Sequence, residues 1–135
     1  MTEWPDVADQ LCRQFWPGPL TLILPRSGIV PDIVAAGGST VGLRAPAHPA
    51  ALALLRQVGK AIAAPSANRS GMPPPQDADA VLEQLDGRIA AVLDSGVTSV
   101  ESPSTLLDLS REPAKLLRQG SLPRAKLESV IELAP

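Results

Sequence analysis

Apolar residues recur at two spacings along this chain of 135 residues, and each spacing predicts a different kind of element. Val7, Leu11 and Phe15 recur every fourth residue, which predicts a helix over residues 6–15. A short, mainly apolar run at residues 20–24, closed by a proline, is typical of a buried strand. The first part of the chain is therefore expected to form a helix followed by a strand.

Apolar and polar positions alternate from Thr40 to Arg44, and this alternation predicts a strand with two different faces. Val41 and Leu43 lie on the apolar face, whereas Thr40, Gly42 and Arg44 lie on the opposite one. Because Gly42 has no side chain, it is expected to leave room for a ligand between its polar neighbours. This strand therefore carries a candidate binding surface.

Capping residues and short apolar runs predict the remaining elements. Three more helices are expected: one begins at about Pro49, one follows an N-cap at Asp77, and one follows an N-cap at Ser121. Strands are expected at residues 61–64, 89–93, 105–109 and 115–118, and a loop at residues 27–39. Helices and strands alternate through the middle of the chain, and strands cluster late. This order predicts an α/β fold of the α+β type, with a mixed, twisted sheet and helices on both faces, in one domain over residues 1–135.

Composition narrows the class of protein. Aromatic side chains make up 2% of the chain, which excludes a base-stacking surface for single strands, and the net charge is −2. One cysteine and one histidine exclude an internal disulfide and a common zinc cluster. The single histidine, His48, suits a helix start, and no Ser-His-Asp triad is expected around it. Neither a transmembrane run nor a signal peptide is expected. The chain is therefore expected to be cytoplasmic and to hold no metal of its own.

Two loops that contain a Pro-Ser pair are the first candidates for chemistry. Ser66 and Asn68 follow the expected strand at residues 61–64, and Ser104 lies at the start of the strand expected at residues 105–109. Small hydroxyl side chains and backbone N–H groups at such positions can converge on a phosphate or a carboxylate. The alternative is that these side chains only satisfy the backbone of their own turns.

Two arginines at the ends of expected strands are further candidates. Arg118 can reach a phosphate with two parallel N–H groups, and the alternative is a surface ion pair with Asp108 or Glu112. Arg44 lies on the polar face of its strand, where it can bind a small carboxylate, and the alternative is a structural salt bridge. Both positions therefore predict anion binding without excluding a structural role.

Five sequence blocks in this order resemble the YrdC-like threonylcarbamoyl-AMP synthases. Each block is unspecific alone, but the five together are highly specific, and they cover the chain from about Asp6 to its C-terminus. The blocks are FWPGPLTLIL (residues 15–24), VGLRAPAHP (41–49), APSANRSG (64–71), STLLD (104–108) and LRQG (117–120).

The resemblance implies a YrdC-like fold and a nucleotidyltransferase reaction. L-Threonine, bicarbonate and ATP, with Mg²⁺ accompanying the nucleotide, would give L-threonylcarbamoyl-adenylate and pyrophosphate. A partner transferase would then move the threonylcarbamoyl group onto the adenosine beside the anticodon of a tRNA.

The resemblance also implies site residues. The positions that correspond to ATP contacts are Ser66, Asn68, Arg118 and Thr40. The positions that correspond to threonine contacts are Arg44, Ser104 and Ala64. No catalytic residue and no metal ligand is carried over.

The chain departs from the family pattern at its N-terminal side. Family members carry a preceding segment with a Pro-Thr-(Asp/Glu)-Thr sequence and a Lys-x-Arg motif whose basic side chains surround the triphosphate. Residues 1–14 contain Arg13 as their only base, so the blocks are expected to be the C-terminal two-thirds of an N-terminally truncated domain. Weak ATP binding, low turnover, an exposed sheet edge and self-association are the expected consequences.

Two other interpretations stay open. The chain could be a catalytically weak module that only binds RNA or a nucleotide, although the net charge of −2 disfavours a strong basic patch. The candidate patch residues are Arg69, Arg88, Arg111, Arg118, Arg124 and Lys126. The fold could also serve a larger carbamoyl-adenylate enzyme with another acceptor, but no acylphosphatase-like or zinc-finger segment is present to favour it.

Overall fold

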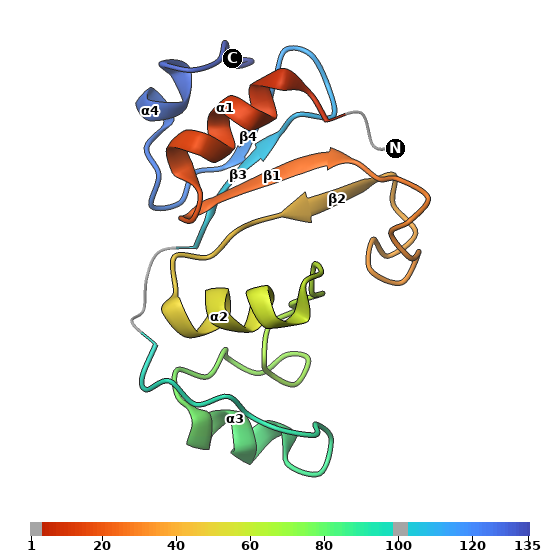
Figure 1. Cartoon of the computed structure of the whole chain (residues 1–135), viewed down its shortest axis with the longest axis vertical. Coiled ribbons are helices and arrows are strands. Elements are labelled where there is room, and N and C mark those ends of the chain that lie inside the picture. Colours follow the sequence, from red (N-terminus) through yellow and green to blue (C-terminus); the bar gives the residue numbers. More distant parts are fainter. Residues whose placement is uncertain (1–3, 99–102) are drawn as a thin grey trace. The chain divides into compact units, whose positions relative to one another are not determined.

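The chain divides into two compact units in the computed structural model, which describes residues 4–98 and 103–135. The sheet unit comprises residues 4–59 and 103–135, and the loop unit comprises residues 60–98 (Figure 1). The sheet unit therefore joins two segments that lie far apart in the sequence. That residues 1–135 form a single domain stays a prediction.

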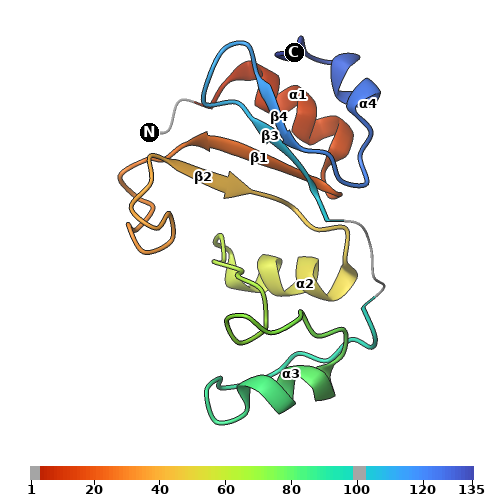
Figure 2. The same ribbon diagram turned by 180° about the vertical axis from the view of Figure 1, so that it is seen from behind.

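The sheet unit contains a mixed sheet with the strand order β2-β1-β3-β4 (Figures 1 and 2). The strands are β1 (Leu20–Pro25), β2 (Thr40–Leu43), β3 (Thr105–Asp108) and β4 (Lys115–Arg118). Central strand β1 pairs antiparallel with β2 and parallel with β3, while β3 pairs antiparallel with β4. The expected mixed sheet of an α+β fold is therefore confirmed.

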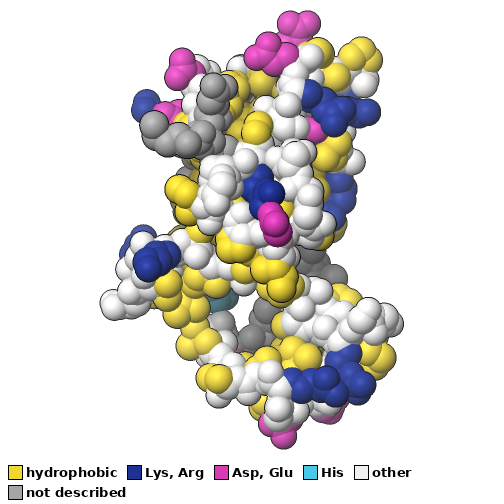
Figure 3. Space-filling view, turned by 90° about the vertical axis from the view of Figure 1, so that its right-hand side faces the viewer, with side chains coloured by type: hydrophobic (Ala, Val, Ile, Leu, Met, Phe, Trp, Pro, Cys, Tyr) yellow, Lys and Arg dark blue, Asp and Glu magenta, His cyan; other side chains and the backbone are white. Residues whose placement is uncertain are grey.

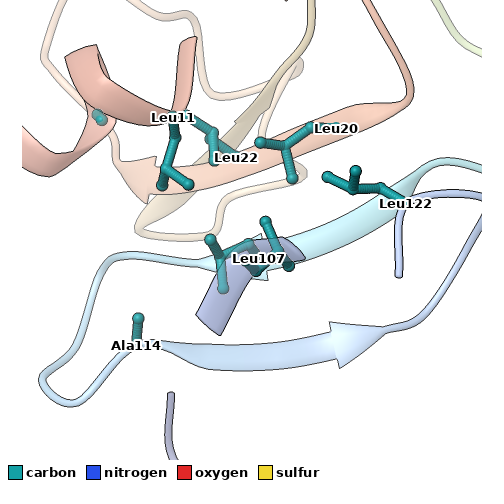
Figure 4. Packing of buried hydrophobic residues seen from close by; sticks show 8 residues of the cluster. Leu11, Leu20, Leu22, Leu107, Ala114 and Leu122 are labelled. Carbon is teal, nitrogen blue, oxygen red and sulfur yellow. The ribbon is translucent and has the colours of Figure 1, made fainter. Parts of the chain in front are cut away.

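One face of this sheet carries the core of the sheet unit. Helices α1 (Asp6–Phe15) and α4 (Arg124–Glu128) both pack on this face. In Figure 4, Leu11 of α1 lies in one cluster with Leu20 and Leu22 of β1 and Leu107 of β3, and all four residues are fully buried. Each such leucine contributes about 1.5–3 kcal/mol through burial. The helix predicted over residues 6–15 is therefore confirmed, and its four-residue spacing places apolar side chains on the face that packs against the sheet.

Two further helices begin at the caps that the sequence predicts. Helix α2 (Pro49–Val58) starts after His48, whose Nδ1 accepts a hydrogen bond from the Ala51 amide at 3.4 Å. Helix α3 (Ala78–Leu85), in the loop unit, starts after Asp77, whose Oδ1 accepts from the Ala80 amide at 2.8 Å. These caps satisfy amide groups that a helix start otherwise leaves unpaired. None of the helices in the described ranges is long and apolar enough to cross a membrane.

Two expected strands are wrong. Residues 61–64 and 89–93 are not strands, and all four side chains at residues 61–64 are exposed. Alanine, which makes up most of the first run, has low β-propensity and little surface to bury against a neighbour. A short apolar run becomes a strand only where another strand pairs with it, and these runs find no such partner within the described loop unit.

The last helix also starts later than expected. Its N-cap is Pro123, not Ser121. The preceding residue, Leu122, has both backbone groups engaged by the Thr105 hydroxyl, which donates to its carbonyl at 2.8 Å and accepts from its amide at 3.1 Å. This cross-link holds residue 122 outside the helix, so a local serine cap cannot operate.

Candidate functional site

The site face, defined as the face of the sheet opposite α1 and α4, is built from the alternate positions of the strands. Because Leu20, Leu22 and Leu24 of β1 are buried in the core, Thr21 and Ile23 point to the site face. Register places Ile23 opposite Gly42 of β2, and Thr21 opposite Leu106 of β3. Side chains at these positions therefore form the floor of the candidate site.

The room expected at Gly42 is partly filled. A Cβ atom at this position would lie 3.2 Å from Ile23 Cδ1 and 3.4 Å from Thr21 Cγ2. The absent side chain therefore makes space first for two side chains of β1. The expectation of an open space between Thr40 and Arg44 is corrected accordingly.

Ser104, just before β3, contacts residues of both neighbouring strands. Its Oγ lies 2.8 Å from Thr21 Oγ1 of β1. Its backbone carbonyl accepts hydrogen bonds from Nε and Nη2 of Arg118, at 3.2 Å and 3.0 Å. The structure therefore brings together two residues that the sequence assigned to different ligands, Ser104 and Arg118.

The loop that carries Ser104 is fixed by a direct backbone contact. A Cβ atom at Gly120 would lie 1.8 Å from the carbonyl oxygen of Pro103, so only glycine fits this position. The buried Thr105 hydroxyl accepts from the Gly120 amide at 2.9 Å and donates to Leu122 O at 2.8 Å. Thr105 is thus a structural cross-link that holds the end of β4 against the start of β3.

Arg44 is held by the corner before β1. Its Nε donates to the Gly18 carbonyl at 2.9 Å, and the Gly18 amide donates to Ala45 O at 2.8 Å. Trp16 holds the same corner, since its indole N–H donates to Leu20 O at 2.8 Å. Neither Nη atom of Arg44 has a hydrogen-bond or ion-pair partner among the described residues, so the salt-bridge alternative finds no support there.

Arg118 is likewise without a carboxylate partner among the described residues. One of the two expected alternative partners, Asp108, is buried and is bound instead by Arg111 Nε at 2.8 Å and by Ser110. Burial would raise the pKa of Asp108, but the Ser110 hydrogen bonds and the Arg111 charge outweigh it and hold this pKa below its usual value. Arg118 therefore keeps its positive charge uncompensated on the site face.

Thr40 is not brought together with these groups. It pairs with Pro25 at one end of β2, whereas Arg44 follows the other end. Four residues of strand separate their Cα atoms by about 13 Å. An ATP contact by Thr40 stays a prediction.

The other expected site residues lie in the loop unit. Ala64 and Ser66 are exposed, and the Ser66 hydroxyl makes no hydrogen bond to the described residues. Asn68 binds its own loop, because its Nδ2 donates to Arg69 O at 3.0 Å and to Met72 O at 2.9 Å. Its Oδ1 is buried without a partner among the described residues. The turn-forming alternative is thus seen for Asn68, while the ligand roles of all three stay predictions.

A shallow cavity of about 180 Å³ beside this loop does not suit an anion. Its lining includes Ala67, Val81 and Leu93 together with the carboxylates of Asp77 and Asp94, and no cationic side chain. A triphosphate would meet negative charge in this cavity.

The face shown in Figure 3 carries no continuous basic surface among the described residues. In the view of Figure 3, the Lys and Arg side chains are scattered among hydrophobic and neutral ones. Two members of the expected patch are paired with carboxylates, Arg111 with Asp108 and Arg124 with Glu128 at 2.6 Å. These pairs reduce the charge available to a nucleic-acid backbone.

The sequence pattern does not single out Thr21 or Gly120. Thr21 lies inside an apolar run, and only the pairing of β1 with β3 places it beside Ser104. Gly120 offers a weak local signal, since a glycine at a strand end often marks a close backbone approach. Both residues belong to the site through contacts that join distant parts of the chain.

A mixed sheet with hydroxyl and guanidinium groups gathered at one end defines this protein as an α+β protein with a candidate anion-binding face. The family model for Sua5, YciO and YrdC, described as "Telomere recombination", matches residues 1–120. The chain therefore belongs to the Sua5/YciO/YrdC family, and the resemblance seen in the five sequence blocks is confirmed.

Named relatives agree with this family. A threonylcarbamoyl-AMP synthase from Pyrococcus abyssi is 46% identical over 96% of this chain, and one from Bacillus subtilis is 47% identical over 94% of it. The crystal structure of P. abyssi Sua5 complexed with L-threonine matches 98% of this chain with a TM-score of 0.87 at 45% identity. The chain spans 38% and 37% of the length of the two curated relatives and 40% of the crystallised chain.

Proposed function

We propose that this chain contributes the substrate-binding sheet of a threonylcarbamoyl-AMP synthase. The enzyme would form L-threonylcarbamoyl-adenylate from L-threonine, bicarbonate and ATP. The threonine amine would combine with bicarbonate to give a carbamate and water, and a carbamate oxygen would then join the α-phosphate of ATP as pyrophosphate leaves. One observation carries the proposal: Ser104 joins a hydroxyl pair and an unneutralised arginine on one sheet face, in a chain 45% identical to a Sua5 solved with L-threonine.

Arg44 and Ser104 are proposed to bind the amino acid. The Nη atoms of Arg44 have no partner among the described residues, while its Nε is anchored on Gly18 O at 2.9 Å. An anchored guanidinium can bind a carboxylate through two parallel N–H groups without first losing much side-chain freedom. The Ser104 hydroxyl would complete this subsite on the sheet unit. For Ala64, in the loop unit, a threonine contact is proposed from the family resemblance alone.

Arg118 is proposed to bind ATP, and the family resemblance supports the same proposal separately for Ser66 and for Thr40. The Arg118 guanidinium carries a charge that no described carboxylate neutralises, and a phosphate fits its planar fork. Asn68 would serve the nucleotide by holding the loop after Ser66 in shape, since its amide donates to Arg69 O at 3.0 Å and Met72 O at 2.9 Å.

Mg²⁺ would reach the site with the nucleotide. No group of three or more His, Cys, Asp or Glu side chains among the residues that the structure describes could hold a metal ion. The ion would therefore be bound mainly by ATP phosphates and water, as is usual for Mg²⁺. The product would pass to a threonylcarbamoyl transferase that modifies tRNA, and we place this nucleotidyl transfer in the cytoplasm.

Binding measurements on the whole chain test the two subsites separately. Arg44→Ala is expected to weaken L-threonine binding about tenfold or more, because a charge-assisted pair contributes about 1.5–3 kcal/mol. The same variant is expected to change ATP binding by less than about twofold. Arg56→Ala, which removes an exposed arginine of α2, is the matched control.

The outcomes separate the possibilities. Selective loss of threonine binding in Arg44→Ala supports the proposal. Absence of L-threonine binding by the unaltered chain, at any concentration up to several millimolar, contradicts it. Equal losses for threonine and ATP indicate general destabilisation and contradict the assigned role of Arg44.

A further inference from the structure

Thr21 occupies a rigid and central position on the site face. Its strand, β1, is hydrogen-bonded on both sides, to β2 and to β3. Thr21 is half-buried, and its β-branched side chain has few accessible rotamers in a strand. Its hydroxyl is therefore held at a defined place in the floor of the site.

The partner of this hydroxyl is Ser104, which has no comparable support of its own. Ser104 precedes β3, and a serine hydroxyl rotates freely unless a neighbour binds it. Thr21 Oγ1 lies 2.8 Å from Ser104 Oγ, whereas Arg118 Nη2 is 3.5 Å from the same oxygen. The short contact with Thr21 is thus the one that sets the direction of the Ser104 hydroxyl.

A pair of hydroxyl groups also limits what Ser104 can offer to a ligand. If Thr21 donates to Ser104, the Ser104 proton is available to an acceptor such as a carboxylate oxygen. If Ser104 donates to Thr21, only the lone pairs of Ser104 remain for a ligand. The Arg118 N–H groups point toward Ser104 oxygens, so a positive charge lies on the same side. Thr21 therefore influences both the direction and the donor capacity of Ser104.

We propose that Thr21 is a positioning residue of the amino-acid subsite, which acts by holding the Ser104 hydroxyl toward the bound L-threonine. This inference rests on the proposed function, because it takes Ser104 as a threonine contact. A purely structural role would depend on the Thr21 methyl group, which packs next to Gly42. The hydroxyl and methyl roles can be separated by substitution.

Thr21→Val keeps the branched shape and the methyl group but removes the hydroxyl, whereas Thr21→Ser keeps the hydroxyl and removes the methyl group. Binding of L-threonine and of ATP to the full chain would be measured by calorimetric or NMR titration, alongside the melting temperature. Thr21→Val is expected to weaken L-threonine binding about three- to tenfold, as one lost hydrogen bond predicts. Thr21→Ser is expected to stay within about twofold of the unaltered chain, and both variants should bind ATP within about twofold.

Selective weakening in Thr21→Val with recovery in Thr21→Ser supports the positioning role. Unchanged threonine binding in Thr21→Val overturns it, and so does equal weakening in both variants, because the methyl group or the packing would then be responsible. If the unaltered chain binds no L-threonine, the proposed function fails and the inference fails with it. That result differs from failure of Thr21 alone, in which the unaltered chain binds threonine and Thr21→Val binds it equally well.

Discussion

The guanidinium of Arg118 donates two hydrogen bonds to the backbone carbonyl oxygen of Ser104, from Nε at 3.2 Å and from Nη2 at 3.0 Å. This contact uses one edge of the guanidinium and joins the end of β4 to the start of β3. A ligand that binds Arg118 therefore meets a side chain whose direction is already set. The hydroxyl of the same residue, Ser104, is proposed to bind the amino acid, so the two proposed ligand sites would share one anchor.

Arg118→Lys tests this anchor. Lysine keeps the charge but has a single ammonium group. It therefore cannot donate two hydrogen bonds to the Ser104 carbonyl and at the same time bind a phosphate through two parallel N–H groups. ATP binding is expected to weaken about tenfold or more, whereas L-threonine binding should change by less than about threefold. Isothermal titration of both ligands measures this, with Arg56→Lys as the control. ATP binding equal to that of the unaltered chain would show that Arg118 does not contact the nucleotide.

Gly120→Ala tests the backbone contact that orders the second loop. The added Cβ would lie 1.8 Å from Pro103 O, and a backbone neighbour cannot move aside as a flexible side chain can. The free energy of unfolding is expected to fall by about 3 kcal/mol or more, beyond the usual cost of overpacking. Urea unfolding followed by circular dichroism measures the loss.

Gly28→Ala is the matched control for this substitution. A Cβ at Gly28 has no atom within 4 Å, so its unfolding free energy should change by less than about 0.5 kcal/mol. Similar, small effects of both substitutions would mean that the contact between residues 103 and 120 is not tight in solution.

Local patterns predict several of the observed helices and strands well. The spacing of Val7, Leu11 and Phe15 gives α1, the apolar run gives β1, and the caps at His48 and Asp77 mark two helix starts. Each of these signals lies within a few residues of the element it specifies. They need no knowledge of the rest of the chain.

Features that depend on distant residues are not predictable in this way. The delayed start of α4 follows from the Thr105 hydroxyl, which binds Leu122 across 17 residues. The hydroxyl pair of Thr21 and Ser104 joins residues 83 positions apart. The sequence indicates Ser104 and Arg118 as candidates, but only strand pairing reveals that they contact each other and that Thr21 belongs with them.

Cys12 is expected to react slowly with thiol reagents. Burial raises the pKa of its thiol, and the nearby charge of Asp9 raises it further. Because the thiolate is the reactive form, the fraction available at pH 8 is smaller than for a free cysteine. Reaction with a disulfide reagent should be several-fold slower than for glutathione and should become equal to it in denaturant. Equal rates in the folded chain would contradict the partly buried position of Cys12.

Asp108 is expected to make the stability of the fold depend on acid pH. The pKa of Asp108 is lowered in the folded state despite its burial, because Ser110 and Arg111 stabilise the ionised carboxylate. A group with a lowered folded-state pKa stabilises the fold above its ordinary pKa of about 3.9, and this contribution is lost as pH falls through the folded-state value. The free energy of unfolding should therefore decline progressively below about pH 5.

Asp108→Asn should flatten this decline, because the titrating carboxylate is removed. At pH 7 it should also destabilise the fold by about 1–3 kcal/mol, since Arg111 loses its partner and a buried hydrogen-bond acceptor is replaced. Glu132→Gln, which neutralises an exposed carboxylate, is the control and should leave the curve unchanged. Urea unfolding at intervals from pH 3 to pH 8 measures all three chains. If Asp108→Asn loses stability toward acid as steeply as the unaltered chain, the decline arises from other carboxylates and the assignment to Asp108 is wrong.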